Sequence, residues 1–240
     1  MTLQPAPRDE RRKPPRRTAE RILAVALDLF NRRGEPQVST TLISAELKIS
    51  PGNLYYHYPA KEALVNALVE RYEAALHRLL DEQDPPAPGW TLLPALLALG
   101  WRYRFLFRDL NDLLARNRQL ETRCQSALQR QHATLQGLAR GLQGGRGQAL
   151  DDADAQALAT NLLLLLSYWF CHEYVRDPRH ALEPDHEAAV LARGTAQLRA
   201  LLQPYLDAAA LAALDEPVPP FGADFAPHSA SLPLLDEDGR

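Results

Sequence analysis

The densest group of chemically capable side chains lies in residues 50–64, SPGNLYYHYPAKEAL. Ser50 followed by Pro51 is a typical helix start. On the two turns that follow, Leu54 and Tyr58 are four residues apart and can face a core, which leaves the other side chains outside. Hydroxyl and imidazole groups donate hydrogen bonds to phosphate oxygens, and an amide can pair with adenine. These residue types therefore indicate contact with DNA through Asn53, Tyr55, Tyr56 and His57.

Four helices are expected to position these groups, at residues 18–33, 39–47, 51–58 and 60–83. A short helix, a tight turn and a second short helix, braced by a longer one, form a helix-turn-helix, whose second helix enters the major groove. Gly52 would let the backbone approach DNA closely, and the N-termini of both short helices can receive phosphates. The alternative is an ordinary helical hairpin with aromatic core residues.

Composition favours an all-α protein, because Leu and Ala dominate and β-branched residues are few. The chain of 240 residues suits one large domain or two small ones. Its net charge of -3 is unevenly spread: residues 1–72 hold 12 Lys and Arg against 8 Asp and Glu, and the remainder holds 15 against 22. A basic head on an acidic body suggests that the head meets a polyanion, although a charged tail without a partner would look the same.

Four segments are expected along the chain. A basic, Pro-rich arm at 1–17 should be disordered, the helix-turn-helix domain should span 18–64, a helical effector-binding and dimerisation domain 65–214, and a disordered Pro-rich tail 215–240. Within the body, helices are expected at 92–107, 109–116, 118–142, 152–176 and 185–206, with a short one at 207–214. The arm could lie in a minor groove or along phosphates, with Arg16 and Arg17 nearest the domain, or it could be a solubilising tail.

A homodimer is expected because one short reading helix gives little specificity, and such modules usually bind palindromic sites in pairs. The segment 157–170, ALATNLLLLLSYWF, is apolar around nearly its full circumference, so it should be buried on all sides, by its own core on one face and by a partner subunit on the other. The predicted dimer contacts are Leu163, Leu166, Leu191, Leu198 and Leu202. The alternative is that these leucines only fill the core of one subunit.

A small-molecule site is expected around residues 100–117, GWRYRFLFRDLNDLLARN, where aromatic and Arg residues alternate. Rings suit an acyl or aromatic part of a ligand, and Arg suits its carboxylate or phosphate. The alternative is a set of core aromatics with solvent-facing arginines. The predicted effector contacts are Trp101, Arg104, Phe105 and Arg108, joined by Tyr168, Trp169 and His172.

No catalytic constellation is evident, and the sequence predicts neither a metal site nor a cofactor. Cys171, His172 and Glu173 are consecutive, so they would point in different directions on a helix. Both cysteines are expected to be reduced thiols in a cytoplasm, since no apolar segment follows the basic N-terminus as in a signal peptide. No membrane span is expected, because the most apolar run is shorter than the roughly 20 residues a bilayer needs. An enzyme with an unrecognised pocket and a protein that coats DNA structurally remain open.

The run TAERILAVALDLFNRRGEPQVSTTLISAELKISPGNLYYHYPAKEALVNAL resembles the DNA-binding region of the TetR family of bacterial transcriptional regulators, most specifically in ISPGNLYYHYPAKEAL. The resemblance implies that Lys61 contacts a phosphate and that Tyr58 is a core aromatic. It also implies that the last two long helices form a four-helix dimer interface. The residues that match DNA-facing positions of the family are Thr40, Thr41, Pro51, Gly52, Asn53, Tyr55, Tyr56 and His57.

Three residues depart from the family pattern. Lys48 stands in the turn where Gly is usual, at a cost of about 1 kcal/mol if φ is positive. Ser44 replaces a small Ala, and Ala60 stands where a capping Ser or Asp is common. GNLYYHY together with YRFLFRDLNDL is similar to the TetR-type regulators of polyhydroxyalkanoate synthesis, which implies an acyl-CoA or fatty-acid-like effector. The expected function is that of a sequence-specific regulator whose operator affinity responds to that effector. The resemblance implies a repressor, because repression is the usual mode of the family.

Overall fold

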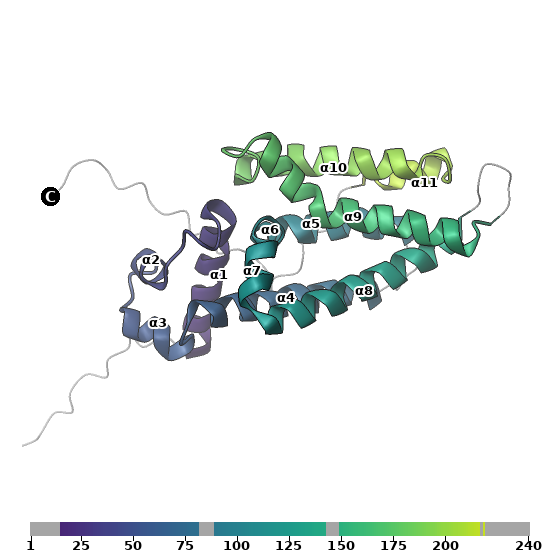
Figure 1. Ribbon diagram of the computed structural model, residues 1–240. Helices are drawn as coiled ribbons and strands as arrows, with labels where there is room; N and C mark the ends of the chain where they lie inside the picture. The colour runs from purple at the N-terminus through teal and green to yellow at the C-terminus, as the bar shows by residue number, and fades with distance from the viewer. Residues whose placement is uncertain (1–14, 82–88, 143–148, 217, 219–240) are drawn as a thin grey trace, which may run out of the picture.

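The computed structural model describes residues 15–81, 89–142, 149–216 and 218, and within them the regular elements are helices. Residues 82–88 and 143–148, and most of the predicted arm and tail, lie outside the described residues. Figure 1 shows α1, α2 and α3 as a small head at one end of a body built largely of long helices. The all-α prediction is confirmed. The helices are α1 Pro15–Arg33, α2 Thr40–Glu46, α3 Pro51–His57, α4 Lys61–Asp81, η1 Gly89–Thr91, α5 Leu92–Arg102, α6 Arg104–Arg108, α7 Leu110–Arg116, α8 Arg118–Arg140, α9 Asp152–Arg176, η2 Pro184–His186, α10 Glu187–Leu202 and α11 Ala208–Ala213.

The head, α1 to α3, forms as its capping residues predict. Ser39 Oγ accepts a hydrogen bond from Leu42 N at 3.1 Å, and Ser50 Oγ accepts one from Asn53 N at 3.2 Å, so each short helix has a side-chain N-cap. Lys48, in the turn between them, has φ 54°, so the turn does adopt the left-handed conformation that Gly would favour. α1 starts at Pro15, three residues earlier than the predicted Thr18, because Pro is well suited to a first helical turn.

The body packs its long helices in layers. α9 lies against α8 and α6, and α10 lies against α5 and α9, as Figure 1 shows. α4 leaves the head and runs along α5 and α8, so it belongs to both parts. Because apolar side chains from the head and the body form one continuous buried cluster, the two parts share a core.

The predicted single helix at 92–107 is divided at Tyr103, whose φ of -113° and ψ of 34° end α5 before α6 begins. Asn31, from α1 in the head, fills the break: its Nδ2 donates to Arg102 O at 2.9 Å, and its Oδ1 accepts from Phe105 N at 3.1 Å. The side-chain amide thereby replaces hydrogen bonds that a continuous helix would make within its own backbone. The break also joins the head to the body.

Four of the five predicted dimer contacts lie inside the subunit, whereas the role of Leu191 stays a prediction. Leu163, Leu166, Leu198 and Leu202 are buried in the core of the subunit, and Leu191 is half-buried. Its own subunit covers only one side of α9, because Leu164, Tyr168 and Val175 are 51%, 53% and 72% exposed. The core of one subunit can cover only part of the circumference of a helix. The described helices of this chain leave a strip of α9 uncovered.

Candidate DNA-binding surface and effector groove

The outer face of α3 presents the side chains that the sequence singles out. Leu54 is buried, whereas Tyr55 is 47% and Tyr56 is 79% exposed. Asn53 is also exposed, so an amide, two phenols and the half-buried imidazole of His57 lie outside the core. Exposure of several large aromatic side chains on one short helix does not stabilise the fold, so it indicates a binding surface. Their placement contradicts the alternative of a helical hairpin with a purely aromatic core.

The first turns of α2 and α3 also present exposed residues. Thr40 Oγ1 and Tyr55 OH share a hydrogen bond of 2.9 Å, which fixes α2 against α3. Thr41, Pro51 and Gly52 are exposed. A Cβ atom at Gly52 would meet no other atom within 4 Å, so the space in front of the α3 backbone is open. The head therefore offers a free helix terminus with polar side chains around it, as direct contact with DNA requires.

Lys61 begins α4, and its ammonium is held by the loop between α1 and α2. Nζ lies 3.0 Å from Glu35 Oε1 and donates to Glu35 O at 3.0 Å. The side chain is 26% exposed, so it can reach a phosphate only by leaving or sharing these contacts. Arg16 and Arg17 lie in the first turn of α1, and the Arg17 side chain is exposed.

Four of the predicted effector contacts are used for internal structure. Trp101, Arg104 and Phe105 are buried. Arg104 donates to Leu182 O at 2.8 Å and to Trp101 O at 3.1 Å, and burial lowers its pKa to about 10. Arg108 donates to Phe30 O at 2.8 Å, where α1 ends. Arg104 and Arg108 thus hold helices together through backbone carbonyls of other parts of the chain.

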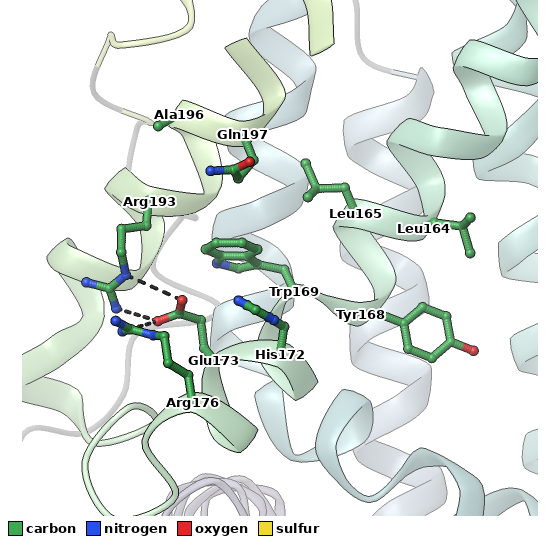
Figure 2. A pocket seen from close by; sticks show the side chains of 10 residues that line it. All are labelled: Leu164, Leu165, Tyr168, Trp169, His172, Glu173, Arg176, Arg193, Ala196 and Gln197. Carbon is green, nitrogen blue, oxygen red and sulfur yellow. Dashed lines mark hydrogen bonds and ion pairs between the residues drawn. The ribbon is translucent and has the colours of Figure 1, made fainter. Parts of the chain in front are cut away.

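The remaining three predicted contacts do line a pocket. Tyr168, Trp169 and His172 lie along a groove of about 550 Å³ between α9 and α10, shown in Figure 2. The rings of Trp169 and His172 lie 5.5 Å apart, and Trp169 Nε1 donates to Val190 O at 3.1 Å. The groove is wide open to one side, and the other lining residues are Leu164, Leu165, Glu173, Arg176, Arg193, Ala196 and Gln197.

One end of the groove carries charges that the sequence analysis missed. Glu173 is buried and pairs with Arg176 at 2.8 Å and with Arg193. Burial raises the pKa of Glu173, but the hydrogen bonds and charges of Arg193 and Arg176 outweigh this and hold its pKa below the usual value. A carboxylate on the apolar helix α9 is the signal that could have identified this cluster, since buried charges need partners.

No other chemistry is assembled in the part of the chain that the structure describes. Those residues contain no group of three His, Cys, Asp or Glu side chains placed to hold a metal ion. Likewise, no helix among them is both long and apolar enough to cross a membrane. The DNA-facing head and the groove between α9 and α10 are therefore the candidate sites.

A helix-turn-helix head on a helical body defines a DNA-binding regulator. Residues 22–68 match the family model described as bacterial regulatory proteins of the tetR family, and residues 71–214 match that of a bacterial transcriptional repressor. The chain belongs to the TetR family of bacterial transcriptional regulators, which bind DNA and are not enzymes.

Individual relatives agree with this family. A TetR-family transcriptional regulator from Marinobacter aquaeolei is 27% identical, with a TM-score of 0.68 over 82% of this chain and 97% of that one. The transcriptional repressor Rv3405c of Mycobacterium tuberculosis is 37% identical over 87 residues, 35% of this chain and 46% of the repressor. The nucleoid occlusion factor SlmA of a Shewanella species is 28% identical over 166 residues, 65% of this chain and 82% of SlmA.

Proposed function

We propose that this regulator is a sequence-specific repressor that binds a palindromic operator as a homodimer and responds to a small molecule. The observation that carries the proposal is the exposed face of α3, where Asn53 can read a base while Tyr55 and Tyr56 contact the backbone. Lys61 supplies a further phosphate contact. A protein with this task works beside the chromosome, in the cytoplasm.

The dimer is proposed to form through the strip of α9 that its own subunit leaves uncovered. Leu164, Tyr168 and Val175 give this strip large apolar groups, and the exposed Ala196 of α10 lines the same groove as Leu164 and Tyr168. Exposed apolar groups on one face favour an interface between protein surfaces. A symmetric pair would place two α3 helices on one side of the dimer.

The effector is proposed to bind in the groove between α9 and α10. Leu165 and Trp169 offer an apolar wall, while Arg176 and Arg193 bring positive charge to one end. This combination suits an amphiphilic anion, so a fatty-acid-like or acyl-CoA effector is consistent with it. Because Leu164 and Tyr168 belong both to the groove and to the uncovered strip, an occupied groove would change how two subunits meet.

The first experiment is a selection from random DNA with the purified full chain, at moderate salt and without ligand. Enrichment of a palindrome, with half-site centres about one helical turn apart or somewhat more, is the expected result. Binding without enrichment would favour a structural role on DNA over a sequence-specific one. A protein that binds no DNA in this experiment, alone or with acyl-CoA added, would contradict the proposed function.

A further inference from the structure

Glu35 holds one cation from the head and one from the body with the two oxygens of a single carboxylate. Oε1 lies 3.0 Å from Lys61 Nζ, and Oε2 lies 2.9 Å from Arg116 Nη2. The Glu35 side chain is only 3% exposed, whereas Arg116, at the end of α7, is 45% exposed. A buried carboxylate depends strongly on its partners, so these two contacts are linked through one group.

The backbone around Glu35 is fixed, so the carboxylate has little freedom to follow either partner. Glu35 N donates to Asp109 Oδ2 at 2.7 Å. Gly34, just before it, has φ 88°, and a Cβ there would come within 2.9 Å of Arg108 Nη2. These contacts attach the loop after α1 to the corner between α6 and α7, which lies between the head and the long helices in Figure 1.

Lys61 is the group whose availability this arrangement controls. Its two contacts with Glu35 occupy N–H bonds of an ammonium that has three. A DNA phosphate that approaches the start of α4 therefore competes with a carboxylate for the same cation.

We propose that Glu35 is a positioning residue that restrains Lys61 and shares its charge with Arg116, so that the α6–α7 corner sets the strength of one DNA contact. The inference rests on the proposed function, in which Lys61 contacts a phosphate. When Arg116 is in place, part of the negative charge of Glu35 is neutralised and Lys61 is held less tightly. When α7 moves and Arg116 withdraws, Glu35 pairs with Lys61 alone, and the affinity for DNA falls.

Arg116 has a second partner with which it can pair when it withdraws from Glu35. It also pairs with Asp112 at 2.5 Å, one turn earlier on α7, so it has a partner to keep if it leaves Glu35. Its hydrogen bonds to Glu35 and Asp112 raise the pKa of its guanidinium, which therefore stays charged in either position. Movement of α7 thus changes the charge near Glu35 without leaving an unpaired cation.

The test measures DNA affinity and its salt dependence for Glu35→Gln, Arg116→Met and Lys61→Met, singly and in pairs. Glu35→Gln releases Lys61, so we expect binding about fivefold tighter, and Arg116→Met about threefold weaker, as for partly exposed ion pairs. Lys61→Met should reduce the slope of log affinity against log salt by about 1.8, the value of two phosphate contacts, one from each subunit of the proposed dimer. Arg116→Met should have no effect of its own once Glu35 is Gln.

Two matched controls account for the change in net charge. Glu73→Gln removes a carboxylate on α4 that pairs with Arg123, and Arg123→Met removes that arginine on α8. Neither residue contacts Lys61 or Glu35 in the pairs that the structure records. In a Lys61→Met background, Glu35→Gln should act no more strongly than Glu73→Gln, and Arg116→Met no more strongly than Arg123→Met.

Several results would overturn the inference. In the wild-type background, Glu35→Gln could change DNA affinity no more than Glu73→Gln does, or it could bind DNA more weakly than the wild type. In the Lys61→Met background, Glu35→Gln could still raise the affinity by more than Glu73→Gln does. If thermal melting shows that Glu35→Gln is unfolded, the Arg116 and Lys61 variants decide alone. In that case Arg116→Met must act no more strongly than Arg123→Met when Lys61 is Met. If the wild type binds no DNA, or if Lys61→Met has the same salt slope as the wild type, the proposed phosphate contact is overturned as well.

Discussion

At the scale of single residues, the head separates the groups that fold α3 from those that face DNA. Leu54 is buried and Ser50 caps the helix, while Asn53 and Tyr56 are exposed. Substitutions on the exposed face should therefore change DNA binding and leave the fold intact. Two positions make this separation measurable.

Gly52→Ala tests whether the α3 backbone closely approaches DNA. Nothing in the protein lies within 4 Å of the added Cβ, and Ala is favoured over Gly in helices by up to about 1 kcal/mol. We expect an unchanged or slightly higher melting temperature together with at least about tenfold weaker operator binding, since a methyl group would stand between backbone and phosphate. Equal affinity in both proteins would show that the backbone stays distant from DNA.

Asn53→Ala tests base reading. An amide pairs with adenine through two hydrogen bonds, and such a pair discriminates by about 1–3 kcal/mol. We expect relaxed preference at one base of each half-site in a repeated selection from random DNA, whereas Tyr56→Ala should weaken binding to all sequences alike. A uniform loss for Asn53→Ala would assign it to the phosphate backbone instead.

At the scale of elements, most helices follow from local signals, and the exceptions depend on distant residues. Capping by Ser39 and Ser50 and the positive φ at Lys48 could be predicted because each depends on neighbours in sequence. The break at Tyr103 could not, because Asn31, 71 residues from Arg102, completes it. Only part of the groove was predicted. Tyr168, Trp169 and His172 line it as expected, but the segment at 101–108 is internal. Arg104 and Arg108 in that segment donate to backbone carbonyls of other elements.

The contact between α9 and α10 should depend on pH through Glu173. Its pKa is lower in the folded chain than in the unfolded chain, so the ionised form stabilises the fold above the unfolded value of about 4.3. This stabilisation disappears as the pH falls through the lower, folded pKa. We expect Glu173→Gln to be less stable than the wild type at pH 7 in urea unfolding, with a difference that shrinks toward pH 3. A constant difference across that range would mean that the charge does not stabilise the fold.

At the scale of the whole molecule, two exposed leucines distinguish a dimer face from ordinary surface. Leu164 on α9 is 51% exposed and Leu128 on α8 is 48% exposed, so either can become Glu without disturbing a packed core. Only Leu164 lies in the strip proposed for the dimer. Similar exposure on different faces makes the pair a matched comparison.

Leu164→Glu should convert the dimer to a monomer in sedimentation experiments, because two like charges would face each other across a symmetric interface. Operator affinity should fall at least about tenfold, since the two α3 helices would no longer bind together. Leu128→Glu should remain dimeric with unchanged affinity. Dissociation by Leu128→Glu, with Leu164→Glu still dimeric, would move the interface to α8.

The attachment of the head has a practical consequence for protein engineering. Asn31 completes the break between α5 and α6, and Glu35 binds Arg116, so the head is not a module that ends within α4. A chimeric regulator cut in α4 would leave the α5–α6 break without its amide and Glu35 without its arginine. A transferable unit of this chain must therefore extend at least from α1 to the end of α7, and helices exchanged after α7 must keep the packing of α9 and α10 on α5 and α6.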